Sequence, residues 1–205
     1  MSIRKLILLG AGGHARSCLD VIEQENKFTV SGFVGTEKEK GSSCYGYEIV
    51  ATDSELSDLI QKVQFAIVTI GQIRSADKRI ELFQNALSFG FRFPTIVSPR
   101  AFVSRNAKLG SGTIVMHGAT VNAGAKVGDN CIINTGSIVE HDVIVGDHCH
   151  ISTGAILNGG VSVGDRSFIG SGSTIKEQTR IGNNCLIGMG VCVRRDIDHD
   201  AVFSG

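Results

Sequence analysis

Residues 127–145 read VGDNCIINTGSIVEHDVIV, and an aliphatic residue recurs in this stretch at every sixth position. The same six-residue period runs from Val97 to Val193 without a missing or an inserted residue. Four positions after each aliphatic residue stands a small or β-branched one, such as Ala125 or Cys131. A helix repeats every 3.6 residues and a strand every two, so a sustained period of six belongs to neither.

This period is typical of a solenoid in which each hexapeptide forms a very short strand and a corner. The aliphatic residue is expected to point inward, and the small residue to fit at the corner. Three hexapeptides per turn would stack residues 18 apart in coils separated by about 4.8 Å. Glycines that directly follow many aliphatic positions are expected to supply permissive backbone at the corners, namely Gly110, Gly128, Gly146, Gly164 and Gly182.

The first part of the chain follows a different pattern, in which apolar strands alternate with amphipathic helices. Apolar runs predict strands at residues 5–9, 28–34 and 65–70, and helices are expected over residues 14–25, from Asp53 or Ser54 onward, and over residues 74–89. Strands alternating with helices indicate a small parallel, Rossmann-like sheet. We therefore divide the chain into an α/β domain, residues 1–95, and a β-helix domain, residues 96–205.

The turn after the first predicted strand reads GAGGHA, residues 10–15, and matches the pattern G-x-G-x-x-A. It opens a predicted helix, whose first backbone N–H groups suit a diphosphate. An NAD site would place an acidic residue at the end of the second strand, where Gly35 and Thr36 stand. A nucleotide-sugar diphosphate is therefore the favoured ligand, while NAD and a purely structural turn stay open.

Composition excludes several classes of function. Lys plus Arg and Asp plus Glu both number 20, so no overall charge draws the chain to nucleic acid or to anionic lipid. No apolar run approaches the roughly 18 residues of a membrane helix, and Leu6–Leu9 is too short for a signal peptide core. We expect a cytoplasmic protein. Because no C-x-x-C pair occurs and Cys131, Cys149 and Cys185 occupy the small-residue position, we expect interior cysteines and no metal site.

The order of the two regions, GAGGHA followed by a hexapeptide prism, resembles the sugar O-/N-acyltransferases of the PglD/NeuD type. These belong to the hexapeptide-repeat, left-handed β-helix acyltransferase superfamily. The resemblance covers essentially the whole chain and is densest over Ile133–Asp142, followed by His150. It implies a left-handed coil, acetyl-CoA as co-substrate, and a homotrimer with active sites between subunits. The implied reaction is N-acetylation of the 4-amino group of a UDP- or dTDP-linked amino-deoxy sugar, for surface glycan or lipopolysaccharide biosynthesis.

Acetyl transfer from a thioester to an amine requires a group that removes a proton from the nucleophile, and an imidazole suits this task. His141 stands between Glu140 and Asp142, and a carboxylate can fix the tautomer of a neighbouring ring. By resemblance, His141 is the general base and Asp142 raises its basicity. Adjacent residues on a strand point to opposite faces, so Asp142 reaches the ring only if the backbone turns there.

The resemblance also implies binding residues. His150 is expected to contact the thioester region of acetyl-CoA, and Ser171 and Met189 to contact the cofactor through backbone groups. The nucleotide sugar is expected at Gly12, Gly13, His14, Gly35, Thr36 and Gly71, with Asn134 as a further polar residue of the site. His117, His148 and His199 are interpreted as structural or surface residues.

Alternative functions remain open at this point. Relatives that use UDP-sugars often carry two aspartates where this chain has Gly35 and Thr36, so the nucleotide is undetermined and a sugar acid is possible. O-acetylation of sialic acid is the second hypothesis. A zinc lyase of the γ-carbonic-anhydrase type also uses hexapeptide prisms, but His148-x-His150 is not its ligand spacing. A trimeric sugar-binding module without catalysis is the non-enzymatic alternative.

Overall fold

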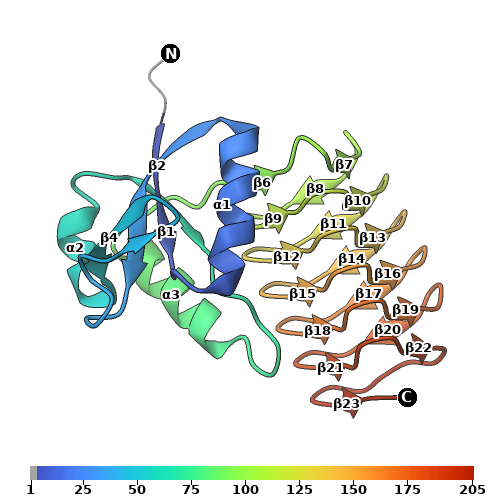
Figure 1. The fold of residues 1–205 in the computed structure, drawn as a ribbon. Coiled ribbons are helices and arrows are strands. Elements are labelled where there is room, and N and C mark those ends of the chain that lie inside the picture. Colours follow the sequence, from blue (N-terminus) through green and yellow to red (C-terminus); the bar gives the residue numbers. More distant parts are fainter. Residues whose placement is uncertain (1–3) are drawn as a thin grey trace.

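In the computed structural model, which describes residues 4–205, an α/β module lies beside one face of an elongated β-prism (Figure 1). The module contains β1 (Arg4–Leu9), α1 (Gly13–Glu25), β2 (Phe28–Gly35), β3 (Ser43–Cys44), β4 (Tyr47–Thr52), the 3-10 turn η1 (Asp53–Glu55), α2 (Leu56–Leu59), β5 (Phe65–Val68) and α3 (Asp77–Ser88). Its sheet has the order β3-β4-β2-β1-β5, and only β3 is antiparallel to its neighbour. The predicted small parallel sheet is confirmed.

Two helices differ from their predicted extents. Thr52, rather than Asp53 or Ser54, caps the second helical segment, because its backbone N–H donates to Glu55 Oε2 over 2.9 Å and its side chain completes a capping box. The α-helix that follows spans only Leu56–Leu59. The third helix begins at Asp77, three residues after its predicted start. The intervening loop from the end of β5 contributes to a cavity described below.

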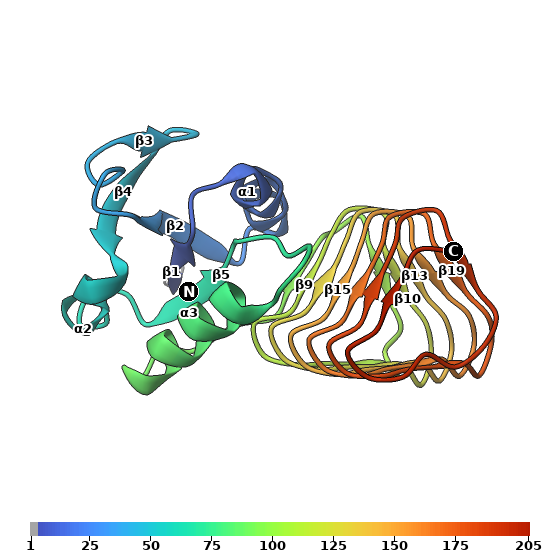
Figure 2. The same cartoon turned by 90° about the horizontal axis from the view of Figure 1, so that it is seen from below.

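The second half of the chain forms a prism with three faces, each a ladder of two-residue parallel strands (Figure 2). Face 1 contains β6 (Ile96–Val97), β9 (Ile114–Val115), β12 (Ile132–Ile133), β15 (His150–Ile151), β18 (Phe168–Ile169), β21 (Leu186–Ile187) and β23 (Val202–Phe203). Face 2 contains β7 (Phe102–Val103), β10 (Thr120–Val121), β13 (Ile138–Val139), β16 (Ile156–Leu157), β19 (Thr174–Ile175) and β22 (Cys192–Val193). Face 3 contains β8 (Lys108–Leu109), β11 (Lys126–Val127), β14 (Ile144–Val145), β17 (Ser162–Val163) and β20 (Arg180–Ile181).

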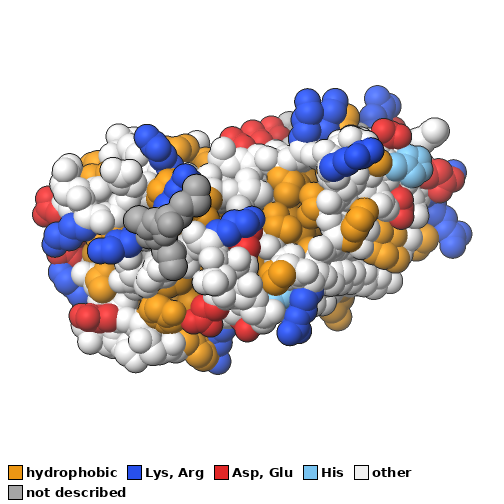
Figure 3. Space-filling view, turned by 90° about the horizontal axis from the view of Figure 1, so that it is seen from above, with side chains coloured by type: hydrophobic (Ala, Val, Ile, Leu, Met, Phe, Trp, Pro, Cys, Tyr) orange, Lys and Arg blue, Asp and Glu red, His pale blue; other side chains and the backbone are white. Residues whose placement is uncertain are grey.

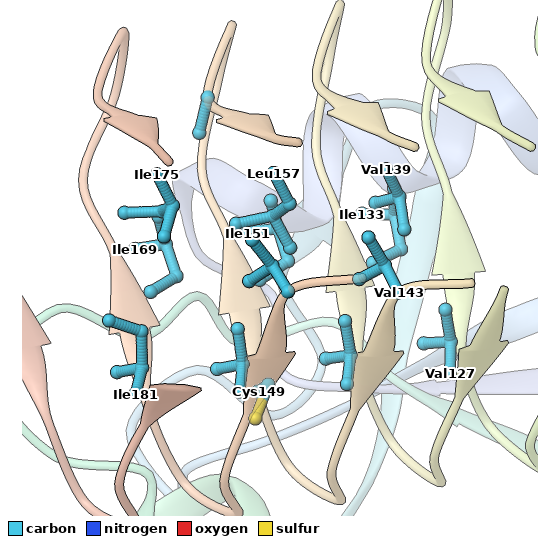
Figure 4. Packing of buried hydrophobic residues seen from close by; sticks show 14 of the residues in the cluster. Val127, Ile133, Val139, Val143, Cys149, Ile151, Leu157, Ile169, Ile175 and Ile181 are labelled. Atoms are coloured by element: carbon cyan, nitrogen blue, oxygen red, sulfur yellow. The ribbon is translucent and has the colours of Figure 1, made fainter. Parts of the chain in front are cut away.

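The register between coils is 18 residues through the hexapeptide repeats, as in the pairing of Ile132 with Ile114 and His150. Only the last coil is shorter, and there Leu186 pairs with Val202. The second residue of each strand points into the prism, where anchors such as Ile133 and Val139 are fully buried (Figure 4). The small residues four positions later, including Cys131, are buried in the same core. The predicted coil of three hexapeptides per turn, a left-handed parallel β-helix, is confirmed.

The glycines after the anchors have a different role from the one predicted. Left-handed backbone occurs three positions after the anchors, for example at Gly136 (φ 65°) and Asp142 (φ 60°). Gly128, which follows an anchor directly, has no such φ, but a Cβ there would lie 2.8 Å from the backbone carbon of Gly146 in the next coil. These glycines therefore allow neighbouring corners to approach closely.

The module and the prism share one hydrophobic cluster. Ile96, Ile114 and Ile132, on the outer side of face 1, pack with β1 and α1 residues that include Leu6. At the rim of this junction, His117 Nε2 lies 2.6 Å from Asp20 Oδ2. The division at residues 95 and 96 stays a prediction, because the shared core crosses it. No helix within residues 4–205 has the length and apolar character needed to cross a membrane.

We expect Gly128→Ala to destabilise the protein by about 1–3 kcal/mol, because an added methyl group would meet the backbone of the next coil. Thermal denaturation followed by circular dichroism measures the effect. Gln178→Gly is the control: Gln178 is exposed at a left-handed corner position (φ 59°), so this change should alter stability by less than about 1 kcal/mol. Equal stability of Gly128→Ala and wild type would refute the close-approach explanation.

Candidate active site

The residues expected in the site lie along the edges where one prism face turns into the next. Edge 1–2 follows the strands of face 1 and carries Asn134, Ser171 and Met189. Edge 2–3 follows the strands of face 2 and carries Glu140, His141 and Asp142, between β13 and β14. Within one chain, the expected catalytic residues therefore lie on edge 2–3, whereas the expected cofactor residues lie on edge 1–2 and, for His150, on face 1.

His141 and Asp142 form a hydrogen-bonded pair in which Nδ1 and Oδ2 are 3.0 Å apart. The left-handed backbone of Asp142 turns the chain at this corner, so two adjacent side chains meet where a regular strand would separate them. A carboxylate only accepts hydrogen bonds, so with Asp142 ionised the Nδ1–H of His141 is the donor and the lone pair of neutral Nε2 remains available. Both side chains are exposed, at 65% and 73% of their areas.

Gly159, one coil beyond His141, was missed by the sequence analysis. A Cβ on this residue would lie 2.6 Å from His141 Nε2. The glycine therefore leaves the space that the ring occupies. The 18-residue separation of Gly159 from His141 is a signal that could have indicated this contact.

Glu140 is the other carboxylate expected in the catalytic group, and among the described residues it forms no hydrogen bond with the imidazole of His141. Its Oε2 instead accepts hydrogen bonds from Asn122 Nδ2 over 2.9 Å and from the backbone N–H of His141 over 3.2 Å. The geometry thus gives Glu140 the role of bracing the corner and leaves Asp142 as the carboxylate that touches the ring.

A cavity of about 630 Å³ lies between the module and edge 1–2, and we name it the interdomain cavity. It brings together all three expected cofactor residues, His150, Ser171 and Met189, with two of the expected substrate residues, His14 and Gly71. Sequence analysis missed its remaining lining, which consists of Gln72, Ile73, Ser152, Phe168, Leu186, Ile187 and Gly188.

The two histidines of the interdomain cavity are held neutral. Burial lowers the pKa of His150 to about 3, and burial assisted by the positive charge of Arg79 lowers the pKa of His14 to about 4. His150 Nδ1 lies 2.9 Å from the carbonyl oxygen of Gln72, and its Nε2 lies 3.0 Å from Asn134 Nδ2. His14 Nε2 is buried without a hydrogen-bond partner among the described residues, so a ligand could supply one.

A second cavity, of about 250 Å³, lies at the carboxyl ends of β1 and β2, and we name it the sheet-edge cavity. It contains the expected substrate residues Gly12, Gly35 and Thr36. Charged side chains also line it: Lys78 Nζ lies 3.3 Å from Asp53 Oδ2, and Glu39 accepts from Thr36 N–H over 2.9 Å. Gly13 opens α1 beside it, with nothing within 4 Å of an added Cβ. The expected substrate residues thus divide between two cavities.

A further hollow, of about 490 Å³, lies on face 3 around Arg180 and Asp196 and contains none of the expected residues. His117 bridges Ser98 Oγ and Asp20 at the junction, and His148 packs edge-on against Phe83. Both contacts are structural. Within residues 4–205, no three His, Cys, Asp or Glu side chains are grouped to hold a metal ion.

Two family descriptions match the chain. The PglD N-terminal domain matches residues 5–84, and the bacterial transferase hexapeptide (six repeats) matches residues 103–141, 124–159, 142–177 and 160–195. Comparison with curated protein sequences finds no match.

Solved structures match almost the whole chain. The acetyltransferase domain of PglB from Neisseria gonorrhoeae, in complex with acetyl coenzyme A, is 31% identical, with a TM-score of 0.90 over 97% of this chain and 95% of that one. A histidine-to-alanine variant of GDP-perosamine N-acetyltransferase from Caulobacter crescentus, in complex with CoA and GDP-perosamine, is 32% identical, with a TM-score of 0.91 over 98% and 93%. WeeI from Acinetobacter baumannii, at 21% identity and a TM-score of 0.86, shares the fold.

The hexapeptide match and the similarity over the whole chain to solved acetyltransferases identify a hexapeptide-repeat acyltransferase. Within that superfamily, the chain belongs to the sugar acetyltransferases that carry a PglD N-terminal domain.

The neutral histidines predict how stability depends on pH. In the unfolded chain the imidazoles of His14 and His150 take up protons near pH 6.5. In the folded protein His14 takes up a proton only near pH 4, and His150 only near pH 3. Lowering the pH from 6.5 to 5 therefore favours unfolding, by up to about 1.4 kcal/mol per pH unit for each histidine. Urea denaturation of wild type and His14→Gln between pH 7 and pH 5 should show a shallower loss in the variant. Parallel curves would contradict the buried neutral state of His14.

Proposed function

We propose that this chain is an acetyl-CoA-dependent N-acetyltransferase that acts on the 4-amino group of a nucleotide-linked amino-deoxy sugar. The observation that carries the proposal is the His141–Asp142 pair, whose Nε2 is available for a proton, on a chain similar over its whole length to acetyltransferases solved with CoA and GDP-perosamine. Its product would serve surface glycan biosynthesis. Both substrates are water-soluble metabolites, so we place the reaction in the cytoplasm.

His141 acts as the general base in this proposal. Its Nε2 takes a proton from the sugar amine as the nitrogen attacks the thioester carbonyl, and Asp142 stabilises the imidazolium that forms. The new N–C bond forms, the C–S bond breaks, and the departing thiolate receives the proton from the imidazolium. The carbonyl oxygen gains negative charge during the attack, so a positioned N–H donor must lie near it.

The geometry of a single chain favours active sites shared between subunits of a homotrimer. His141 lies on edge 2–3, whereas the interdomain cavity lies along edge 1–2 and contains no residue of edge 2–3. In a trimer, His141 of one subunit can face the interdomain cavity of its neighbour. Each of the three active sites then takes its base from one chain and its binding cavity from another.

Face 2 is the surface best suited to contact another copy. Its outward positions carry no charge, and they are Phe102, Thr120, Ile138, Ile156, Thr174 and Cys192. The outward positions of face 3 include three cations, Lys108, Lys126 and Arg180. Figure 3 looks down on the end of the prism where its first coil lies, and hydrophobic side chains gather there beside the module, with charged side chains of both signs around them.

We assign the nucleotide to the sheet-edge cavity and the start of α1, where backbone N–H groups and Lys78 can meet a diphosphate. The sugar and the acetyl group would then extend into the interdomain cavity, past His14 and toward Asn134. Asp53, Glu39 and Lys78 could each form hydrogen bonds with a base or a ribose. Which nucleotide fits is therefore a question for a substrate panel.

We expect His141→Ala to lower the acetylation rate by about 10²–10⁴-fold, because it removes the general base. Asp142→Asn should cause a smaller loss, since the ring keeps a hydrogen-bonding neighbour but loses its charge. Thiol release from acetyl-CoA is measured with GDP-, UDP- and dTDP-linked 4-amino sugars and with sialic acid. His199→Ala, at an exposed histidine of edge 3–1, serves as the control and should retain full activity. Acetylation of sialic acid alone would favour the O-acetyltransferase hypothesis.

We expect light scattering to give a mass three times that of one chain. Ile156→Glu places a charge on face 2 and should shift the protein toward monomers and abolish activity, because the base and the cavity then separate. Ser162→Glu adds the same charge to face 3 and should leave the trimer intact. A fully active monomer would rule out the shared active site.

A further inference from the structure

A buried guanidinium connects α3 to the prism. Arg79 is 2% exposed; its Nη1 donates to Gln72 Oε1 over 3.0 Å, and its Nη2 donates to the carbonyl oxygen and to Oδ1 of Asn130. No carboxylate within residues 4–205 forms an ion pair with it. A buried charge without a counter-ion costs free energy. Such a residue therefore suggests a role beyond packing.

Gln72 is held from two sides by this arrangement. Its Oε1 accepts from Arg79, and its Nε2 donates to the carbonyl oxygen of Arg166 over 3.1 Å. The side chain is 3% exposed, so the loop between β5 and α3 is fixed to edge 3–1 of the prism. The backbone carbonyl of Gln72 is thereby held 2.9 Å from His150 Nδ1.

This contact determines the tautomer of His150. A carbonyl oxygen only accepts, so Nδ1 must carry the proton. In the neutral ring Nε2 then carries a lone pair, which accepts from Asn134 Nδ2 over 3.0 Å. Both ring nitrogens are therefore occupied by protein groups, and His150 has no N–H left to offer a ligand.

Contacts within the chain also fix the orientation of the Asn134 side chain. Its Oδ1 accepts from the backbone N–H of Thr135 over 2.8 Å, and one hydrogen of Nδ2 is donated to His150. The second Nδ2 hydrogen has no acceptor among the described residues. Asn134 lies on edge 1–2, one coil before Ser152 of the interdomain cavity.

We propose that Gln72 and Arg79 are positioning residues that lock His150 in its Nδ1–H tautomer, so that the ring directs one N–H of Asn134 toward an oxygen acceptor of the bound ligand. His150 then acts through Asn134 and does not itself donate to the thioester. The tautomer follows from contacts within the chain, whereas the role of Asn134 toward a ligand rests on the proposed acetyl transfer.

The tautomer can be measured without any substrate. In ¹⁵N NMR spectra of the full-length protein between pH 8 and pH 5, we expect His150 to show a protonated Nδ1 and an unprotonated Nε2, without titration. His150→Gln identifies the signal. A protonated Nε2 at pH 8, or titration of the ring near pH 6, would overturn the proposal even if the enzyme acetylates a sugar.

The second test removes the link between Gln72 and Arg79. In Gln72→Ala we expect a mixture of His150 tautomers. The kcat should then be roughly two- to tenfold lower, the range that corresponds to the neutral hydrogen bond between Asn134 and the ligand. Gln72→Glu keeps an acceptor for Arg79 but loses the donor to the carbonyl oxygen of Arg166, so it should restore a single tautomer and part of the lost kcat. A wild-type tautomer and kcat in Gln72→Ala would refute the positioning role.

Asp20→Asn is the matched control. It weakens another contact between the module and the prism, the one between Asp20 and His117, without touching His150. We expect it to leave the His150 tautomer and kcat unchanged. If Asp20→Asn altered both as Gln72→Ala does, the effect would come from general loosening of the junction and the proposal would fail. Absence of acetylation in wild type would remove the proposed function while leaving the tautomer result valid.

Discussion

The hexapeptide coils of the prism are held by one repeated contact, in which an aliphatic anchor packs on the anchors 18 residues before and after it. Ile133 lies between Val115 and Ile151 in this column, and all three are completely buried. Because the column keeps one register through the hexapeptide repeats, each corner residue there has a set position along an edge. The placement of the side chains at the prism edges depends on this constant register.

The corner that carries His141 and Asp142 shows how the constraint acts. The coil demands left-handed backbone at the third residue after an anchor, a conformation that costs a non-glycine residue free energy. At Asp142 the same conformation brings the carboxylate onto His141. One coil further on, Gly159 leaves space for the ring. Stacking that is needed for stability thus also places an imidazole, its carboxylate and the glycine that makes room for the ring.

The junction between module and prism adds what the repeats lack. Face 1 is regular in backbone, yet its outward residues change from buried isoleucines to His150 and Phe168 as the module ends. The loop that carries Gly71 and Gln72 closes one side of the interdomain cavity at this change. Arg79 holds that loop in place from within the protein. Hydrophobic packing thereby joins the module to the prism, and the hydrogen bonds at the border of this packing shape the interdomain cavity.

The sequence alone determined the prism, the small parallel sheet and the family, because a six-residue period and a glycine turn are local patterns. It also paired His141 with Asp142, and the contact between them depends on one corner. Only the tertiary structure separated His14 from Gly12, turned Glu140 away from the ring, and brought Gln72 to His150. Those contacts join residues far apart in the chain or depend on side-chain direction at a corner. Packing of the module on face 1 decides the places of His14 and Gln72, and no spacing along the chain encodes that packing. The direction of Glu140 is decided at edge 2–3, where it meets Asn122.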